Sequence, residues 1–257
     1  MSEGKKEILL GDCLELMKDI PNGSIDMILC DLPYGTTACK WDVIIPFEPL
    51  WEQYKRIIKD NGAIVLFGSQ PFTTKLIHSN VKMFKYELVW DKIKSSQPHL
   101  SKIQPMKRHE NILIFGKRKI NYYPQKVLKD KPRKAYGSKA TNTNDHKLGL
   151  KQLPPYLITH SYPTSIFSFS NADNTNRVHP TQKPVALMEY LIKTYTNECD
   201  LVLDNCAGSG TTAIACLNTN RQFIVMEKEQ KYYDIILKRV GDFNKNFEPQ
   251  TLFGKEM

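Results

Sequence analysis

The sequence has no long apolar run, and the longest uninterrupted ones, such as Ala63 to Phe67, hold five residues. Because a membrane-spanning helix needs about 20 mostly apolar residues, the sequence predicts none. The amino terminus, MSEGKKEILLGD, also lacks the apolar stretch and the small-residue cleavage site of a signal peptide. We therefore expect a soluble protein of the cytoplasm.

Cysteine is scarce, and its spacing fits neither a disulfide framework nor a metal site. The six cysteines form no C-x-x-C pair and no Cys/His cluster with zinc spacing. Several lie among apolar or small residues, where Cys behaves as a small hydrophobic residue. The sequence predicts reduced, mostly buried thiols and no metal.

The chain does contain enough apolar material for a core, together with an excess of positive charge. Of its 257 residues 41% are hydrophobic, and 36 Lys and Arg against 27 Asp and Glu give a net charge of +9. Residues 82–139 alone carry 16 basic and 4 acidic side chains, a net +12, which leaves −3 for the remainder. Such a concentrated basic stretch indicates a polyanionic partner, with a solvated basic loop as the alternative.

Segments with strand and helix patterns alternate at both ends of the chain, which predicts a parallel sheet covered by helices. The expected strands are residues 7–10, 25–30, 63–67, 86–90, 111–115, 201–203 and 223–226. The expected helices are residues 47–59, 72–81, 184–195, 211–217 and 232–239. The first of these helices is expected to stop at Asn61-Gly62. From 117 to 170 the periodicity is lost, which is unusual for a loop without a function.

The segment LVLDNCAGSGTTAIACL has the pattern of a strand, a Gly-x-Gly turn and a helix. Gly208 and Gly210 can adopt positive φ, and the helix that follows points free amides at a ligand. Glu227 lies 23 residues after Asp204, a spacing that suits hydrogen bonds to ribose hydroxyls. The third glycine of G-x-G-x-x-G is absent, which counts against NAD, and a tight turn without a ligand is the alternative. We predict a nucleoside-bearing cofactor.

The DLPYG turn directly follows an apolar strand, so it should lie at the carboxyl edge of the sheet, where ligands bind in α/β folds. Asp31 offers an anionic acceptor, Pro33 fixes the backbone so that the carbonyl of Leu32 can be presented rigidly, and Tyr34 offers an aromatic face. Two acceptors can hold the two hydrogens of a nucleobase amino group and orient its lone pair toward an electrophile. Asp31 would then stabilise the charge that develops on nitrogen.

The order of DLPYG (31–35), HPTQKP (179–184) and DNCAGSGTT (204–212) resembles the β group of S-adenosylmethionine-dependent DNA amino-methyltransferases. The resemblance covers most of the chain except residues 120–170. It implies an α/β Rossmann-like class I methyltransferase sheet that is mostly parallel, seven-stranded and circularly permuted. The implied organisation is a catalytic half at 1–118, an inserted target-recognition region at 119–172, and an S-adenosylmethionine-binding half of the same domain at 173–257.

The resemblance also implies roles for individual residues. Asp31, Leu32, Pro33 and Tyr34 match the catalytic tetrapeptide, although Leu32 stands where the family usually has Pro. Since only its carbonyl has a proposed role, catalysis should survive. Asp12 matches an acid near the adenine of the cofactor, and Lys183 with nearby amides would bind the methionine carboxylate. The full set implied at the cofactor is Asp12, Cys13, His179, Thr181, Gln182, Lys183, Asp204, Cys206, Gly208, Gly210, Thr211, Thr212, Glu227 and Lys228.

The expected function is methyl transfer to the exocyclic amino group of a base flipped out of double-stranded DNA. An Asp at position 31 resembles enzymes that act on adenine N6, whereas many cytosine-N4 enzymes carry Ser there. Cytosine N4 is therefore the first alternative, followed by an RNA or protein methyltransferase and a non-catalytic nucleic-acid-binding protein. The resemblance further implies a bacterial or phage-encoded protein, a homodimer and a partner restriction endonuclease.

Other polar residues have less specific signals. The residues expected to contact DNA phosphates are Lys107, Arg108, Lys117, Arg118 and Lys119. His109, Glu110 and His179 could act as acids or bases, but a methylated base amino group loses its proton readily, which favours structural roles for them. Trp41 either covers the flipped base or belongs to the core.

Overall fold

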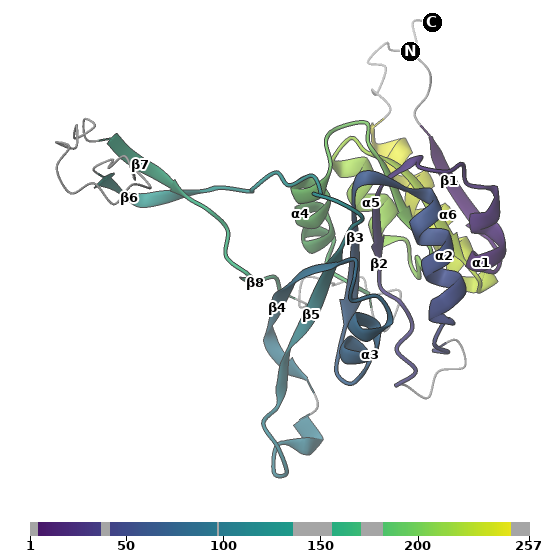
Figure 1. The fold of residues 1–257 in the computed structure, drawn as a ribbon, viewed down its shortest axis with the longest axis horizontal. Helices are drawn as coiled ribbons and strands as arrows, with labels where there is room; N and C mark the ends of the chain where they lie inside the picture. Colours follow the sequence, from purple (N-terminus) through teal and green to yellow (C-terminus); the bar gives the residue numbers. More distant parts are fainter. Residues whose placement is uncertain (1–4, 37–41, 97, 136–155, 171–181, 248–257) are drawn as a thin grey trace, which may run out of the picture. The chain divides into compact units, whose positions relative to one another are not determined.

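Eight strands form one mixed sheet, which can be followed in Figure 1. They are β1 (Lys6–Leu10), β2 (Ile25–Cys30), β3 (Ile58–Gly68), β4 (Phe84–Ser96), β5 (Lys107–Phe115), β8 (Ile166–Ser168), β9 (Leu201–Asp204) and β10 (Gln222–Glu227). Their order across the sheet is β1-β10-β9-β2-β3-β5-β4-β8. Neighbours run parallel except that β5 is antiparallel to both β3 and β4.

The computed structural model describes residues 5–36, 42–96, 98–135, 156–170 and 182–247. The chain divides into two compact units, one formed by residues 1–123 with 165–257 and the other by residues 124–164. The large sheet belongs to the first unit. None of the helices in the described part of the chain has the length and apolar character needed to cross a membrane.

Helices cover the sheet on both faces. The helical elements are α1 (Cys13–Leu16), η1 (Met17–Asp19), α2 (Phe47–Ile57), α3 (Phe72–Ser79), η2 (Pro98–Leu100), α4 (Val185–Tyr195), α5 (Thr211–Asn218) and α6 (Gln230–Phe247). One buried cluster joins α1, α2 and α3 to the sheet, and the other joins α4, α5 and α6. Successive residues of β3 alternate between them, with Ile64 and Leu66 in the first cluster and Val65 and Phe67 in the second. A strand buried on both faces needs apolar residues at every position, which explains the run AIVLF.

The predicted methyltransferase-type α/β sheet is confirmed, with two corrections. The sheet has eight strands instead of seven, because β8 adds to the edge beside β4. The Val89 amide donates to the Ser165 carbonyl at 2.8 Å, and the Trp90 indole donates to the Phe169 carbonyl at 3.0 Å. In the second correction, Asn61-Gly62 does not end α2. That helix stops at Ile57, and the two residues belong to β3.

The second unit contains a two-stranded antiparallel ribbon of β6 (Val127–Ala135) and β7 (Tyr156–Ser161). Most residues of both strands are exposed, so no face is buried and no alternation of apolar and polar residues is required. The ammonium of Lys126 lies 4.7 Å from the ring centre of Tyr162. The lack of a buried face accounts for the loss of periodicity in this part of the sequence.

Candidate active site

A cavity of about 930 Å³ opens at the carboxyl ends of the parallel strands. Its wall combines the segments that follow β1, β2, β9 and β10 with side chains of β4 and β5. The sheet order brings these segments together although they are far apart in the sequence. The predicted site residues that line it are Asp12, Cys13, Asp31, Leu32, Pro33, Tyr34, Gln182, Lys183, Asp204, Cys206, Gly208, Thr211, Thr212, Glu227 and Lys228.

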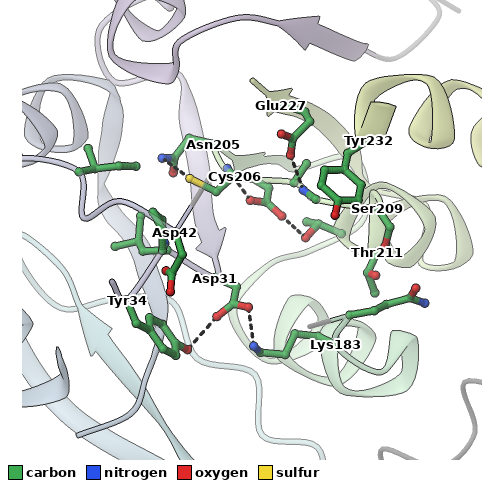
Figure 2. Close-up of a pocket in the computed structure, with 18 of the residues that line it drawn as sticks. Asp31, Tyr34, Asp42, Lys183, Asn205, Cys206, Ser209, Thr211, Glu227 and Tyr232 are labelled. Atoms are coloured by element: carbon green, nitrogen blue, oxygen red, sulfur yellow. Dashed lines mark hydrogen bonds and ion pairs between the residues drawn. The ribbon is translucent and has the colours of Figure 1, made fainter. Parts of the chain in front are cut away.

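Asp31 lies just beyond β2, between Tyr34 and Lys183 (Figure 2). Its Oδ1 accepts a hydrogen bond of 2.7 Å from the Tyr34 hydroxyl, and its Oδ2 accepts one from the Lys183 ammonium. The Tyr34 ring stacks on Phe72 of α3 with centroids 4.9 Å apart. Burial raises the pKa of the Asp31 carboxyl above its usual range, although the Lys183 ammonium opposes this shift. The structure therefore holds the predicted acceptor in a fixed position and surrounds it with donors.

Lys183 lies in the cavity beside the predicted catalytic carboxylate. Its buried ammonium pairs with Asp31 and lies 3.4 Å from Oε2 of Glu110. An ammonium taken out of water needs carboxylate partners, and among the described residues Asp31 and Glu110 provide them. Burial alone would lower the pKa of Lys183, but the two carboxylates raise it above its usual range. Lys183 lines the cavity, and its role toward the methionine carboxylate stays a prediction.

The Gly-rich turn after β9 is held by Glu227 at the end of β10. One carboxylate oxygen of Glu227 accepts from the Gly208 amide at 2.8 Å and the other from the Glu229 amide at 2.9 Å. Gly208 has a φ of +54°, in the left-handed region that favours glycine. Gly210 has a φ of +77°, but a Cβ there would lie 2.9 Å from Ile236 of α6. Gly210 therefore serves helix packing and does not line the cavity.

Asp204 organises the same turn from the end of β9. Its carboxylate accepts from the Cys206 amide at 3.1 Å and from the Thr212 hydroxyl. Burial of this carboxylate raises its pKa to about 6. Beside it, Asn205 is fixed by a 2.5 Å hydrogen bond from the Tyr54 hydroxyl of α2. These contacts fix the shape of the turn.

Asp12 marks the other end of the cavity, after β1. Its carboxylate caps α1 by accepting from the Leu14 amide at 3.0 Å and pairs with Lys228 at 3.2 Å. The Asn205 amide lies 3.6 Å from the thiols of both Cys13 and Cys206. Two other predicted cofactor residues, His179 and Thr181, lie outside the described residues. Trp41, predicted either to cover the flipped base or to belong to the core, also lies outside them.

The residues expected to contact DNA separate into two groups. Lys107 and Arg108 begin β5. Since β5 runs antiparallel to β3 and Asn111 pairs with Gly68, the start of β5 lies near the carboxyl end of β3. Lys107 is half-buried and donates to Ser69, whereas Arg108 forms a two-pronged ion pair with Asp91 at 2.6 and 2.7 Å.

The second group lies at the opposite edge of the sheet. Lys117, Arg118 and Lys119 follow the end of β5, where Phe115 pairs with Ile64, and the first two pair with Asp60 at 3.6 Å. Since strands rise about 3.3 Å per residue, these groups are roughly 15 Å from the carboxyl edge. They therefore lie away from the edge that holds Asp31, and their contact with DNA phosphates stays a prediction.

Sequence reasoning missed several cavity residues. Among those that it did not assign to the site are Asp42, Lys92, Lys94, Glu110, Asn205, Ser209 and Tyr232. A signal existed for Glu110, because it is in phase with Ile112 and Ile114 on β5, and both belong to the buried cluster under α4 and α5. A carboxylate that continues a buried apolar face indicates a paired or functional group.

The fold and site define an α/β enzyme that binds a nucleoside-bearing cofactor at the carboxyl edge of its sheet. The family model described as DNA methylase, covering N6 and N4 methyltransferases, matches residues 25–238, and the chain belongs to this family. A relative, the DNA adenine methyltransferase YhdJ of Escherichia coli K12, is 28% identical over 253 residues, 91% of this chain and 82% of YhdJ.

Solved structures agree with this assignment. The crystal structure of M1.HpyAVI in complex with SAM has a TM-score of 0.62 at 25% identity, over 91% of this chain and 98% of that one. The cytosine-N4-specific PvuII DNA methyltransferase has a TM-score of 0.66 at 16% identity, over 97% and 88%, and shares the fold. The predicted family, enzyme class and S-adenosylmethionine cofactor are thereby confirmed.

Proposed function

We propose that this protein transfers a methyl group from S-adenosylmethionine to adenine N6 in double-stranded DNA. The observation that carries the proposal is that one cavity holds both the Asp31 carboxylate and the Gly208 turn with Glu227. A volume of about 930 Å³ lies near the upper end for single ligand sites, which suits a nucleoside cofactor together with a flipped base. When bound, S-adenosylmethionine supplies an electrophilic methyl group.

Asp31 and the neighbouring backbone would orient the target nitrogen. A base amino group is a weak nucleophile because its lone pair is delocalised into the ring. The Asp31 carboxylate and the Leu32 carbonyl would each accept one of its hydrogens and aim the lone pair at the methyl carbon. Asp31 would stabilise the positive charge that develops on the nitrogen as it takes up the methyl group, until a proton is lost. The Tyr34 face that does not stack on Phe72 would hold the base ring.

The choice of adenine rests on Asp31 and on the adenine specificity that the name of YhdJ gives. The fold does not distinguish the two bases, because the PvuII enzyme shares it. The test is incubation with labelled S-adenosylmethionine and unmethylated DNA, followed by separation of the nucleosides. We expect N6-methyladenine as the product. Label in N4-methylcytosine would refute the base assignment, and label in RNA or protein alone would refute the substrate.

Glu227 is expected to support cofactor binding both by holding the turn and by accepting from ribose hydroxyls. In Glu227→Ala the amides of Gly208 and Glu229 lose their acceptor, so the turn is no longer held in shape. We predict that the Kd for S-adenosylmethionine rises at least about tenfold, the effect of losing one or two charge-assisted hydrogen bonds. Isothermal titration calorimetry measures it, with Glu15→Ala on the exposed side of α1 as the control. An unchanged Kd in Glu227→Ala would remove Glu227 from the cofactor site.

We further propose that DNA lies along the β4–β5 ribbon, which extends beyond the neighbouring strands (Figure 1). Lys94 lines the cavity and is exposed, and Lys102 is exposed in the connection between the two strands. The double variant Lys94→Ala/Lys102→Ala should bind DNA about tenfold more weakly. The slope of log affinity against log salt should fall by about one for each lost phosphate contact.

The double variant Arg118→Ala/Lys119→Ala, which removes the same charge at the amino edge of the sheet, away from the β4–β5 ribbon, provides the comparison. Fluorescence anisotropy at several salt concentrations should give nearly wild-type slopes for it. Equal losses in the two double variants would mean that net charge alone, and not the β4–β5 ribbon, determines binding.

The second unit is proposed as the target-recognition region of the insert predicted at residues 119–172. Its described strand β6 carries exposed basic side chains, namely Lys131, Arg133 and Lys134. Such side chains suit phosphate contacts in a DNA groove. A homodimer and a partner restriction endonuclease stay predictions.

A further inference from the structure

The catalytic carboxylate is already occupied by donors of the protein itself. Oδ1 of Asp31 accepts from Tyr34, and Oδ2 accepts from the Lys183 ammonium. An ammonium paired with a carboxylate neutralises its charge and weakens it as an acceptor for another donor. Asp31 can bind the hydrogen of a base amino group and stabilise a developing positive charge only when its ion pair with Lys183 is weakened.

A second acceptor for Lys183 lies within reach. Oε2 of Glu110 is 3.4 Å from the Lys183 ammonium and, within the described parts of the chain, is a buried oxygen without a hydrogen-bond partner. Its other oxygen is held by the ammonium of Lys92 on β4. The Lys183 ammonium also lies 5.0 Å from the ring centre of Phe67, a cation–π contact. A small movement of one ammonium would exchange its partner without exposing a charge.

We propose that Glu110 is a positioning residue of methyl transfer: it takes over the Lys183 ammonium when the target base arrives and so frees Asp31 for the base amino group. This inference rests on the proposed function of Asp31. It accounts for the position of Oε2 of Glu110, which lies 3.4 Å from the Lys183 ammonium and makes no hydrogen bond within the described parts of the chain. It also explains why Lys92 accompanies Glu110, since one carboxylate between two ammonium groups stays ionised.

The electrostatics of the cluster agree with this exchange. Burial works against ionisation of Glu110, but the ammonium groups of Lys183 and Lys92 hold its pKa below the usual value. Asp31 instead has its pKa raised by burial and by the charge of Glu110, with Lys183 in opposition. In the described segments, the charged and titratable groups that act on Asp31 are Cys30 on β2, Tyr34, Glu110 on β5, Lys183 before α4 and Asp204 on β9.

A double-mutant cycle on the full-length enzyme tests the proposal. The measurement is kcat against pH at saturating S-adenosylmethionine and DNA, so that titrations that only affect binding are removed. Lys183→Gln should move the acid limb to higher pH, because Asp31 then faces Glu110 without an ammonium between them. Glu110→Gln should move it to lower pH, because a nearby negative charge is lost. The double variant should lie between them.

The size of kcat gives a second readout. Glu110→Gln should lower kcat about tenfold with little change in KM for DNA, because Lys183 is left without a charged second acceptor. In the Lys183→Gln background the same change should have no further effect on kcat, since no ammonium remains to be moved. Glu110→Asp keeps the charge but shortens the side chain and should recover part of kcat. Glu52→Gln, the same change at an exposed position of α2 away from the cavity, should behave as wild type.

Two outcomes overturn the proposal. One is a wild-type kcat and acid limb in Glu110→Gln, and the other is an equal loss of kcat in the wild-type and Lys183→Gln backgrounds. Asp31→Ala separates this failure from that of the proposed function. If Asp31→Ala is inactive while Glu110→Gln is normal, only the role of Glu110 is refuted; if Asp31→Ala is fully active, the role of Asp31 fails and that of Glu110 with it.

Discussion

Replacing Asp31 with Ala is expected to lower kcat for methyl transfer by roughly a factor of 10³ and to leave cofactor binding largely intact. The carboxylate would orient the base nitrogen and stabilise the charge that forms on it, and loss of one such group typically costs 10² to 10³ in rate. The residues that would hold the cofactor belong to other strand ends, around Gly208 and Glu227. Removal of Asp31 leaves the Lys183 ammonium paired with Glu110, so the fold should tolerate the change.

Single-turnover transfer of labelled methyl groups to DNA measures the rate, and calorimetric titration measures cofactor affinity in the same preparation. Asp60→Ala is a suitable control, because Asp60 is exposed and lies at the amino edge of the sheet. Transfer by Asp31→Ala at more than about a tenth of the wild-type rate would be inconsistent with the role in orientation and charge stabilisation. A combined loss of activity and cofactor affinity would instead indicate that Asp31 shapes the whole cavity.

The elements that could be predicted from the sequence are those with a buried face. Residues 25–30 were expected as a strand and form β2 with the same bounds, because IDMILC is apolar on both faces of a parallel sheet. Helix α4 follows Pro184 as expected from helix-start preferences. By contrast, the strands of the second unit are mostly exposed, and β8 has three residues, too few to show a period.

The candidate site divides in the same way. Asp31, Gly208 and Glu227 could be predicted because each lies at or shortly after the end of a strand, at the ligand-binding edge of the sheet. The pairing of Lys183 with Asp31 joins residues 152 positions apart and depends on how α4 packs, which no local pattern encodes. The position of Lys117 to Lys119 depends on the antiparallel direction of β5. Charge counting along the chain cannot give that direction.

Asp204 should make the folded protein less stable at neutral pH than an uncharged residue would. Its carboxylate is buried, and burial raises its pKa to about 6 from the ordinary 3.8. Between these values the folded protein binds more protons than the unfolded chain, so the free energy of unfolding falls as the pH rises through this interval and is level above it. A shift of about two pKa units corresponds to about 3 kcal/mol.

Asp204→Asn is therefore expected to raise the free energy of unfolding by up to about 3 kcal/mol at pH 7.5 and by about 1 kcal/mol or less at pH 4.5. The amide retains an oxygen for the Cys206 amide, and its NH₂ group can donate to the Thr212 hydroxyl. Urea unfolding without cofactor at the two pH values measures the difference, and Asp234→Asn on the exposed side of α6 should stay within about 0.5 kcal/mol of wild type at both. An equal effect of Asp204→Asn at both pH values would contradict a destabilising ionised Asp204. Because the carboxylate lines the cofactor cavity, the stabilised variant should bind S-adenosylmethionine more weakly, which would account for a buried acid that the fold alone does not need.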